Sequence, residues 1–282
     1  DKRSKFVHYR PRTLVINNLE FDHADIFADV TAIETQFHHL IRTVPASGRI
    51  IANGAEAGVQ RALARGCWSE LEWFNVADGW SVQEGAAGSD TVQFALAGAA
   101  LAEGRIPMAG AHNRLNALAA LAAARHVGVP PQQALDSMVR FQGIKRRMEV
   151  RGTVNGVTVY DDFAHHPTAI ALTLQGLRQR ERQGRILAVL EPRSNTMKLG
   201  VMAARLPESL ESADAVFCYA RGLNWDVAQA LSPLGEKART YAEIEALVAA
   251  VVQAAEPGDH VLVMSNGGFE GVHQRILSAL QA

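Results

Sequence analysis

The regular alternation of apolar runs and helical patterns in the second half of the chain is the feature that most constrains its fold. From about Gly143, strand-like segments such as Ile186–Leu190 alternate with segments of helical periodicity such as residues 168–182. A short, continuous apolar run is typical of a strand that is buried on both faces. Strands alternating with helices predict a parallel sheet with helices on both sides and ligands beyond the carboxyl ends of the strands. Further strands are expected at Ala215–Tyr219 and His260–Met264, and Asn155-Gly156 predicts a hairpin within residues 154–160.

The first half of the chain shows a similar but less regular pattern. A β-branched run at residues 13–17 predicts a buried strand, and the apolar spacing over residues 29–43 predicts a helix. Residues 68–106 combine Trp, Val and Phe with glycine-rich turns, which favours antiparallel strands. The other expected elements are a strand at residues 49–52 and helices at residues 56–65, 111–127 and 131–141. A hinge near residues 143–147 would then separate two α/β units.

Composition limits what such a chain does. Its 282 residues, 48% of them hydrophobic and 20% charged, suffice for two domains with buried cores. A net charge of -1 gives no global attraction to nucleic acid or to an anionic membrane, and the apolar runs are too short to span one. Cys67 and Cys218 lack metal-ligand or redox spacing, which favours a reducing compartment and hence the cytoplasm. Because the chain starts at Asp1 without a methionine, we expect it to be a fragment.

The first polar cluster, residues 17–25, directly follows the first predicted strand. It contains Asp22 and His23. Carboxylates and imidazole on one loop suit a divalent cation that serves a bound phosphate, since Mg²⁺ keeps several waters and takes few protein ligands. A polar loop in which Asp25 or Asp29 caps the next helix is the alternative.

The second cluster, residues 110–120, opens a predicted helix. Asn113 and Asn116 are three residues apart, so they share one face of that helix near its N-terminus. Amides there can recognise a base edge, and the exposed N–H groups favour anions. Simple N-capping by these residues is the alternative.

The third cluster joins Arg146 and Arg147 to the polar run at residues 161–167. An arginine can clamp phosphate oxygens, and a carboxylate after a strand, such as Asp162, can accept hydrogen bonds from ribose hydroxyls. The adjacent histidines that begin with His165 can position phosphate or water. A solvated arginine pair, a helix-capping aspartate and a packed turn are the corresponding alternatives.

The fourth cluster, residues 191–198, follows the strand predicted at Ile186–Leu190. Its Arg193 and Lys198 would suit a substrate that is rich in carboxylates. A solvated loop is the alternative.

The order of these motifs along the chain is more specific than any one of them. The motifs are Asn17-Asn18-x-x-x-Asp22-His23, Gly110-x-His112-Asn113-x-x-Asn116, Gly143-x-x-x-Arg147-x-Glu149 and Asp161-Asp162-x-x-His165-His166-Pro167. Together they resemble the Mur ligase family, and the similarity covers nearly the whole chain.

The resemblance implies a fold and an activity. Part of a central ATPase-type α/β domain would occupy residues 1–144, followed by a Rossmann-like C-terminal α/β domain at residues 145–282. Mur ligases join a carboxylate to an amine with ATP through an acyl phosphate, and charge develops on the transferring oxygens. ATP and Mg²⁺ are therefore the expected cofactors, with magnesium and cationic side chains stabilising that charge.

The resemblance also assigns roles to particular residues. His23 is expected to bind the magnesium ion nearest the acyl phosphate, and Arg147 to lie near the ATP phosphates, which makes both candidate catalytic residues. Asn116 matches the asparagine that contacts adenine, with Asn113 beside it, and Asp162 matches the aspartate that holds the ribose. The remaining candidates are His165 for the nucleotide, and Arg193, Asn195 and Lys198 for an incoming peptide.

Residues 19–27, 36–39 and 190–198 are most similar to one branch of the family. That branch attaches the recycled murein tripeptide L-alanyl-γ-D-glutamyl-meso-diaminopimelate to UDP-N-acetylmuramate during peptidoglycan recycling. The branch that adds L-alanine to the same UDP-sugar is the nearest alternative. A non-catalytic nucleotide- or peptide-binding module is an alternative of another class.

Two departures from the family pattern qualify these expectations. Many members carry a carbamylated lysine fifteen residues after the magnesium-binding histidine, and that position is His38 here. The family's phosphate loop, a further magnesium-binding glutamate and the UDP-sugar domain would precede the point where this chain begins. We therefore expect the 282-residue chain alone to be catalytically incompetent.

Overall fold

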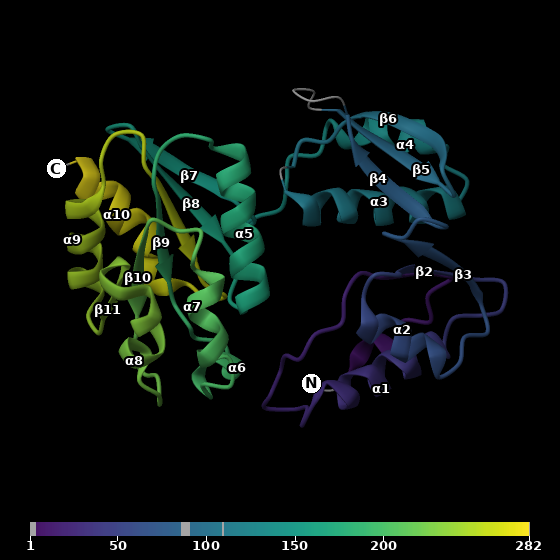
Figure 1. The fold of residues 1–282 in the computed structure, drawn as a ribbon, viewed down its shortest axis with the longest axis horizontal. Coiled ribbons are helices and arrows are strands. Elements are labelled where there is room, and N and C mark those ends of the chain that lie inside the picture. The colour runs from purple at the N-terminus through teal and green to yellow at the C-terminus, as the bar shows by residue number, and fades with distance from the viewer. Residues whose placement is uncertain (1–3, 86–90, 109, 282) are drawn as a thin grey trace. The chain divides into compact units, whose positions relative to one another are not determined.

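The computed structural model describes residues 4–85, 91–108 and 110–281. The chain divides into two compact units, residues 1–142 and 143–282. Each unit contains a sheet with helices on its two faces (Figure 1).

The sheet of the first unit has its strands in chain order, β1-β2-β3-β4-β5-β6. The strands are β1 (Thr13–Ile16), β2 (Arg49–Asn53), β3 (Glu70–Phe74), β4 (Trp80–Glu84), β5 (Thr91–Leu96) and β6 (Ala99–Arg105). The helices are α1 (Val30–Ile41), α2 (Ala57–Ala64), α3 (Ala111–His126) and α4 (Pro131–Met138), preceded by a short 3₁₀ turn at Lys5–His8. The predicted helices and strands of this half are thus confirmed, although α4 is shorter than expected.

One part of the prediction for residues 68–106 is wrong. β4, β5 and β6 are antiparallel as expected, but β3 runs parallel to β2. The helix α2 lies between β2 and β3 in the chain, and such a crossover returns the chain in the same direction. β3 is therefore the third strand of a β-α-β-α-β arrangement and does not begin the antiparallel part of the sheet.

Side-chain alternation along β2 separates two cores on the faces of this sheet. Ile50 and Ala52 pack among the residues of α1 and α2, whereas Ile51 packs with the residues of α3 and α4. The second core contains Phe74, Trp80 and Phe94 and the small residues of α3, all buried. The alanine-rich face of α3 allows the helix to lie close to the sheet.

The sheet of the second unit has the strand order β11-β10-β9-β12-β8-β7. The strands are β7 (Glu149–Val154), β8 (Val157–Asp162), β9 (Ile186–Leu190), β10 (Ala215–Tyr219), β11 (Ala238–Tyr241) and β12 (His260–Met264). The helices are α5 (Pro167–Arg180), α6 (Asn195–Lys198), α7 (Leu206–Ser209), α8 (Val227–Leu231), α9 (Ile244–Ala254) and α10 (Val272–Gln281), and shorter 3₁₀ segments lie at Ala203–Arg205, Ser232–Lys237 and Phe269–Gly271.

Five strands of this sheet are parallel, as the alternation predicts, and β7 adds an antiparallel edge. The hairpin between β7 and β8 turns at Asn155 and Gly156, whose positive φ angles of 49° and 79° suit a tight primed turn. The prediction did not include β11, because its short sequence mixes Arg and Thr with Ala and Tyr and carries no apolar run.

Both faces of this second sheet are buried. Along β9, Leu187 and Val189 face a core shared with α9 and α10, and the intervening Ala188 and Leu190 are also fully buried. Figure 1 shows α9 and α10 on one side of the sheet and α5 on the other. This double burial explains why β9 is a continuous apolar run. In the described part of the chain, no helix is long and apolar enough to cross a membrane.

A buried carboxylate fixes the end of this unit that precedes β9 and β12. Asp259 is 4% exposed and accepts hydrogen bonds from Arg185 Nη2 at 2.6 Å, Arg185 Nε at 3.1 Å and the Glu256 backbone N–H at 2.8 Å. Burial is the strongest influence and raises the pKa of Asp259, but these hydrogen bonds outweigh it and hold the pKa below its ordinary value.

We expect Asp259→Asn to lower the free energy of unfolding by about 3 kcal/mol at pH 7. The amide NH₂ group of asparagine would replace a carboxylate oxygen that now accepts hydrogen bonds, so it would face N–H donors that it cannot pair with. Since the pKa of Asp259 is lowered in the folded state, its stabilisation is present above the unfolded value of 3.8 and is lost as the pH falls through the folded value. The difference from wild type should therefore shrink in acid. Urea unfolding followed by circular dichroism measures both effects.

Glu245→Gln is the matched control, since Glu245 also pairs with an arginine, Arg275, at 2.9 Å but has a side chain that is 72% exposed. It should cost less than about 1 kcal/mol. Equal losses from the two substitutions would show that burial adds nothing at Asp259.

Candidate functional site

In the first unit, asparagines gather at the carboxyl ends of the parallel strands. Asn17 follows β1, Asn53 ends β2 and Asn75 follows β3. Asn17 Nδ2 donates to Asn116 Oδ1 at 3.2 Å, and Asn75 Nδ2 donates to the buried Asn53 Oδ1 at 3.1 Å. The structure thus brings Asn116 of α3 to the end of β1. The sequence analysis did not single out Asn53 and Asn75, because an isolated asparagine after a strand is an ordinary turn residue.

The loop after β1 presents His23 to solvent. His23 has a positive φ of 54°, which is rare for a residue with a side chain. Its backbone N–H donates to Asp22 Oδ1 at 2.7 Å, and its carbonyl accepts from the N–H groups of Ile26 and Phe27. The imidazole is 68% exposed, with Nε2 4.0 Å from Asp22 Oδ2. A backbone held in this way directs the imidazole outward.

The capping alternative is confirmed for Asp29 and does not involve His23. Asp29 Oδ1 accepts the Ala32 N–H at 2.8 Å and forms the N-cap of α1. Asp22 and His23 lie before this cap and take no part in the helix. The polar loop therefore holds both a helix cap and a separate imidazole–carboxylate pair.

The capping alternative for Asn113 and Asn116 is wrong. The N-cap of α3 is Gly110, with a φ of 98° and no side-chain hydrogen bond to the helix. Asn113 and Asn116 lie within the first turns of α3. The N-cap position of α3 is thus a glycine, and the Asn116 side chain accepts a hydrogen bond from Asn17.

His38 lies in the last turn of α1. α1 connects the parallel strands β1 and β2 and so runs antiparallel to both. Residues late in α1 therefore lie toward the start of β2, and the ring of His38 is 6.0 Å from that of Trp68, which precedes β3. His38 Nδ1 is buried without a hydrogen-bond partner in the described part of the chain.

The magnesium site expected at His23 would have few protein ligands. Among residues 4–85, 91–108 and 110–281, no three His, Cys, Asp or Glu side chains gather as a metal cage. Mg²⁺ usually keeps several waters and binds only one or two protein groups. An exposed imidazole beside the Asp22 carboxylate fits that mode and does not fit a closed structural site.

In the second unit, one arginine organises the loops at the carboxyl ends of β8 and β12. Arg146 Nη2 donates to the carbonyls of Ser265 and Gly267, the latter at 2.8 Å, and its Nε lies 3.4 Å from Asp161 Oδ1. Its guanidinium also lies over the Phe163 ring at 5.1 Å. Arg146 is therefore half-buried and bound, so a solvated pair is the wrong interpretation for this residue.

Arg147, by contrast, is exposed. Its guanidinium lies 5.4 Å from the centroid of the Phe163 ring, and its charge acts on the neighbouring Asp162. The residue pattern left open which of the two arginines would clamp phosphate, and only the family resemblance pointed to Arg147. The exposed position of Arg147 is compatible with that role.

Asp162 is a buried acceptor within its own unit. It is 2% exposed, and its oxygens accept the Met148 N–H at 2.8 Å, the Ala164 N–H at 2.7 Å and the Thr173 hydroxyl at 3.4 Å. Burial raises the pKa of Asp162, and these donors with the nearby Arg147 partly oppose the increase. The carboxylate already holds the start of this unit to the loop after β8, so it is not a helix cap.

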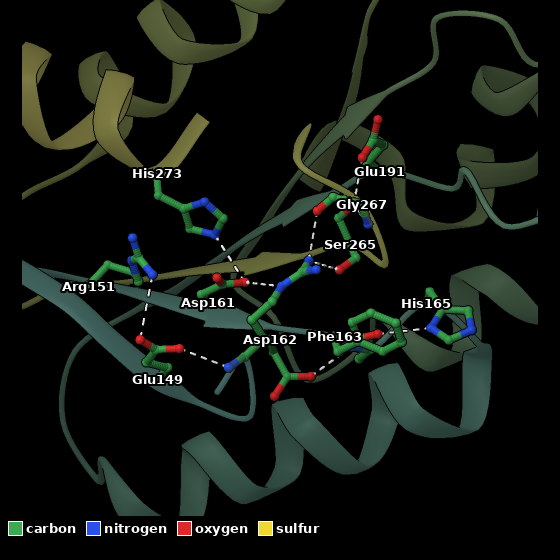
Figure 2. A network of polar contacts seen from close by, with 12 residues as sticks. Glu149, Arg151, Asp161, Asp162, Phe163, His165, Glu191, Ser265, Gly267 and His273 are labelled. Atoms are coloured by element: carbon green, nitrogen blue, oxygen red, sulfur yellow. Dashed lines mark hydrogen bonds and ion pairs between the residues drawn. The ribbon is translucent and has the colours of Figure 1, made fainter. Parts of the chain in front are cut away.

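His165 belongs to the loop after β8, and His273 lies on α10. His165 Nδ1 is 2.9 Å from the Phe163 carbonyl, and the two rings meet edge to face at 5.3 Å. His273 Nε2 is 3.3 Å from Asp161 Oδ1 (Figure 2). Burial lowers the pKa of His273, while the Asp161 carboxylate opposes the shift. The sequence analysis missed His273, because a single histidine on an amphipathic helix carries no signal.

The loops after β9 and β12 are joined at the candidate peptide site. Ser265 Oγ donates to Glu191 Oε2 at 2.5 Å, and the Gly267 N–H donates to Ser265 Oγ at 3.0 Å (Figure 2). Arg193 has a side chain that is 44% exposed, with Nη1 4.0 Å from Glu191 Oε2. Arg193 therefore lies beyond the carboxyl end of β9, next to the loop after β12.

Asn195 and Lys198 occupy the first and last positions of α6. Ser194 caps this helix by accepting the Met197 N–H at 3.3 Å. Lys198 is exposed and lies one helical turn from Asn195. The structure places both residues close in sequence and space to Arg193.

Family models match both units of the chain. The model described as the Mur ligase middle domain matches residues 1–124, and the model described as the Mur ligase glutamate ligase domain matches residues 146–267. The chain belongs to the Mur ligase family.

Individual relatives agree with this assignment. The chain is 49% identical, over 99% of its length, to the UDP-N-acetylmuramate–L-alanyl-γ-D-glutamyl-meso-2,6-diaminoheptandioate ligase of Escherichia coli (strain K12), of which it spans 62%. It is 33% identical to the UDP-N-acetylmuramate–L-alanine ligase of Desulfitobacterium hafniense (strain Y51), matching 98% of this chain and 64% of that one. The chain thus spans about three fifths of the length of its curated relatives.

A solved structure supports the fold over the whole chain. The crystal structure of a murein peptide ligase from Psychrobacter arcticus 273-4 matches all of this chain and 60% of that one, with a TM-score of 0.73 and 40% identity. The UDP-N-acetylmuramate–alanine ligase of Thermotoga maritima shares the fold at a TM-score of 0.76 and 19% identity, covering 98% of this chain and 61% of that one. The predicted class, an ATPase-type α/β domain followed by a Rossmann-like α/β domain, is confirmed.

We expect Asp162→Ala to destabilise the second unit by about 2–3 kcal/mol, because it leaves two buried backbone N–H groups without an acceptor. Hydrogen exchange of residues 144–164, followed by mass spectrometry, should become faster. Asp226→Ala is the control, since Asp226 caps the exposed start of α8 by accepting one N–H, that of Gln229 at 2.9 Å. It should cost about 1 kcal/mol and leave residues 144–164 protected. If residues 144–164 exchange at the wild-type rate in Asp162→Ala, Asp162 does not hold this segment in place.

Proposed function

We propose that this chain is the ATP-binding and C-terminal part of an ATP-dependent amide ligase of peptidoglycan recycling. The whole protein would join the tripeptide L-alanyl-γ-D-glutamyl-meso-diaminopimelate to UDP-N-acetylmuramate with formation of ADP. The observation that carries the proposal is 48–49% identity over essentially the whole chain to two ligases named for this reaction. Relatives named for L-alanine addition reach 33%, so the tripeptide reaction is preferred over its nearest alternative.

The chemistry of the proposal is the formation of one amide bond at the expense of ATP. The carboxylate of UDP-N-acetylmuramate attacks the γ-phosphate of ATP, which gives an acyl phosphate and ADP. The amine of the tripeptide then attacks the acyl carbon, and the tetrahedral intermediate expels inorganic phosphate. Negative charge grows on phosphate and acyl oxygens in both steps, so cationic groups fixed near these oxygens lower the barrier.

The residues of the first unit suit the nucleotide and its metal. His23, exposed beside Asp22, would hold magnesium, which stabilises the charge on the transferring oxygens when bound. Asn116, with Asn113 on the same helix, would contact adenine. Asn17 holds the Asn116 side chain at 3.2 Å, so the amide of Asn116 is already oriented before a base binds.

The residues of the second unit suit the phosphates, the ribose and the peptide. Arg147 would face the phosphates, with His165 positioning phosphate or water nearby. Asp162 would serve the ribose through an acceptor site that the two backbone N–H groups on its oxygens leave open. Arg193, with Asn195 and Lys198 on the adjoining helix, would receive the peptide carboxylates.

We expect His23→Ala in the full-length enzyme to lower kcat by about tenfold or more with little change in the affinity for ATP, because the metal acts on charge that develops in the transition state. Steady-state kinetics at saturating Mg²⁺ give the result. His39→Ala is the control, since His39 is exposed on the last turn of α1 and has no proposed role. Near-wild-type turnover in His23→Ala would remove His23 from the metal site.

We expect Arg193→Lys to reduce kcat/KM for the tripeptide by about ten- to hundredfold, because lysine keeps the charge but loses the planar fork that binds a carboxylate in two places. The KM values for ATP and UDP-N-acetylmuramate should hardly change. Arg239→Lys, at an exposed position on the edge strand β11, is the control. If all three substrates were affected equally, Arg193 would have a structural role and the peptide site would lie elsewhere.

A further inference from the structure

Gly267 leaves the space that the Arg193 side chain occupies. A Cβ atom at residue 267 would lie 2.0 Å from Arg193 Nη1, 2.5 Å from Cζ and 2.6 Å from Cδ. These separations are far below van der Waals contact. The backbone of Gly267 does not need glycine, since its φ is not in the left-handed region. The requirement for glycine at this position is therefore steric, and the atoms nearest to an added Cβ all belong to Arg193.

The backbone around Gly267 is held on several sides. Its carbonyl accepts from Arg146 Nη2 at 2.8 Å, and its N–H donates to Ser265 Oγ at 3.0 Å. The Ser265 N–H donates to the Asp162 carbonyl at 3.1 Å, and the Ser265 hydroxyl is bound to Glu191. Because the loop is fixed and the arginine is flexible, an added methyl group would displace the guanidinium and leave the loop in place.

Glu191 is kept from pairing closely with Arg193. Its Oε2 accepts the Ser265 hydroxyl at 2.5 Å but lies 4.0 Å from Arg193 Nη1. In the part of the chain that the structure describes, no other carboxylate is in ion-pair contact with Arg193. The guanidinium group of Arg193 thus packs against a glycine and remains half-exposed, so an incoming carboxylate could reach it.

We propose that Gly267 is a positioning residue that seats Arg193 and thereby sets specificity for the carboxylates of the amine substrate. The inference rests on the proposed function, because Arg193 contacts a peptide substrate only if the protein carries out the proposed ligation. A carboxylate is bound most tightly when both of its oxygens meet the planar guanidinium. Displacing the guanidinium by an ångström or more would break this two-point contact without removing the charge.

The test is a matched pair of substitutions in the full-length enzyme. Gly267→Ala should raise the KM for the tripeptide by about tenfold, with the KM for ATP and for UDP-N-acetylmuramate and the melting temperature unchanged. Gly268→Ala is the control, since a Cβ there meets nothing within 4 Å and its φ of -79° suits any residue. It should match wild type in every measurement.

A double-mutant cycle with Arg193→Lys identifies the residue through which Gly267 acts. If Gly267 acts by seating Arg193, Gly267→Ala should change the tripeptide KM by less than about twofold once Arg193 is already lysine. Additive effects, or a loss for all three substrates with a lower melting temperature, would overturn the inference. Wild-type kinetics in Gly267→Ala would overturn it as well.

The same measurements separate this inference from the proposed function. Wild-type behaviour of Gly267→Ala, with Arg193→Lys impaired for the tripeptide, rejects the role of Gly267 and keeps the peptide site at Arg193. If Arg193→Lys itself leaves tripeptide kinetics unchanged, the proposed peptide site fails first and the inference with it.

Discussion

The buried carboxylate of Asp162 is the contact on which the second unit's site depends. It accepts the N–H of Met148, which joins the start of the unit to the loop after β8. Arg146 and Met148 both adopt left-handed backbone conformations, with φ angles of 59° and 51°. Such conformations are unfavourable for residues with side chains and persist only where surrounding contacts enforce them. Asp162 supplies one of these contacts, and Phe163 supplies another by donating its N–H to the Arg146 carbonyl at 2.8 Å.

This strained segment explains why two adjacent arginines have different environments. With Arg146 in the left-handed region, its guanidinium turns inward and reaches the carbonyls of Ser265 and Gly267. Arg147 is left at the surface. The order of the two residues in the sequence carries no information about which one turns inward. Only the backbone conformation decides, and it depends on contacts with residues more than a dozen positions away.

The sequence predicted most of the fold because the relevant signals are local. Continuous apolar runs identified β9, β10 and β12, and the Asn155-Gly156 pair identified the β7–β8 hairpin. The direction of β3 was missed, because parallel or antiparallel pairing is decided by the crossover and not by the strand itself. The site could be predicted only in part for the same reason. Charged residues after strands are visible in a sequence, whereas the space that Gly267 leaves to the Arg193 side chain is not.

The close approach of Arg193 to Gly267 lies in loops, whereas the fold depends on the sheet that carries them. β9 and β12 are neighbouring strands whose apolar side chains are fully buried, so their packing tolerates little variation. The loops that follow them are joined by the hydroxyl of Ser265 and the carboxylate of Glu191, and this contact does not involve the guanidinium of Arg193. A side chain at residue 267 would meet Arg193 first, outside these packed strands. Loops fixed in this way on a rigid sheet allow one ligation chemistry to be combined with different amine substrates.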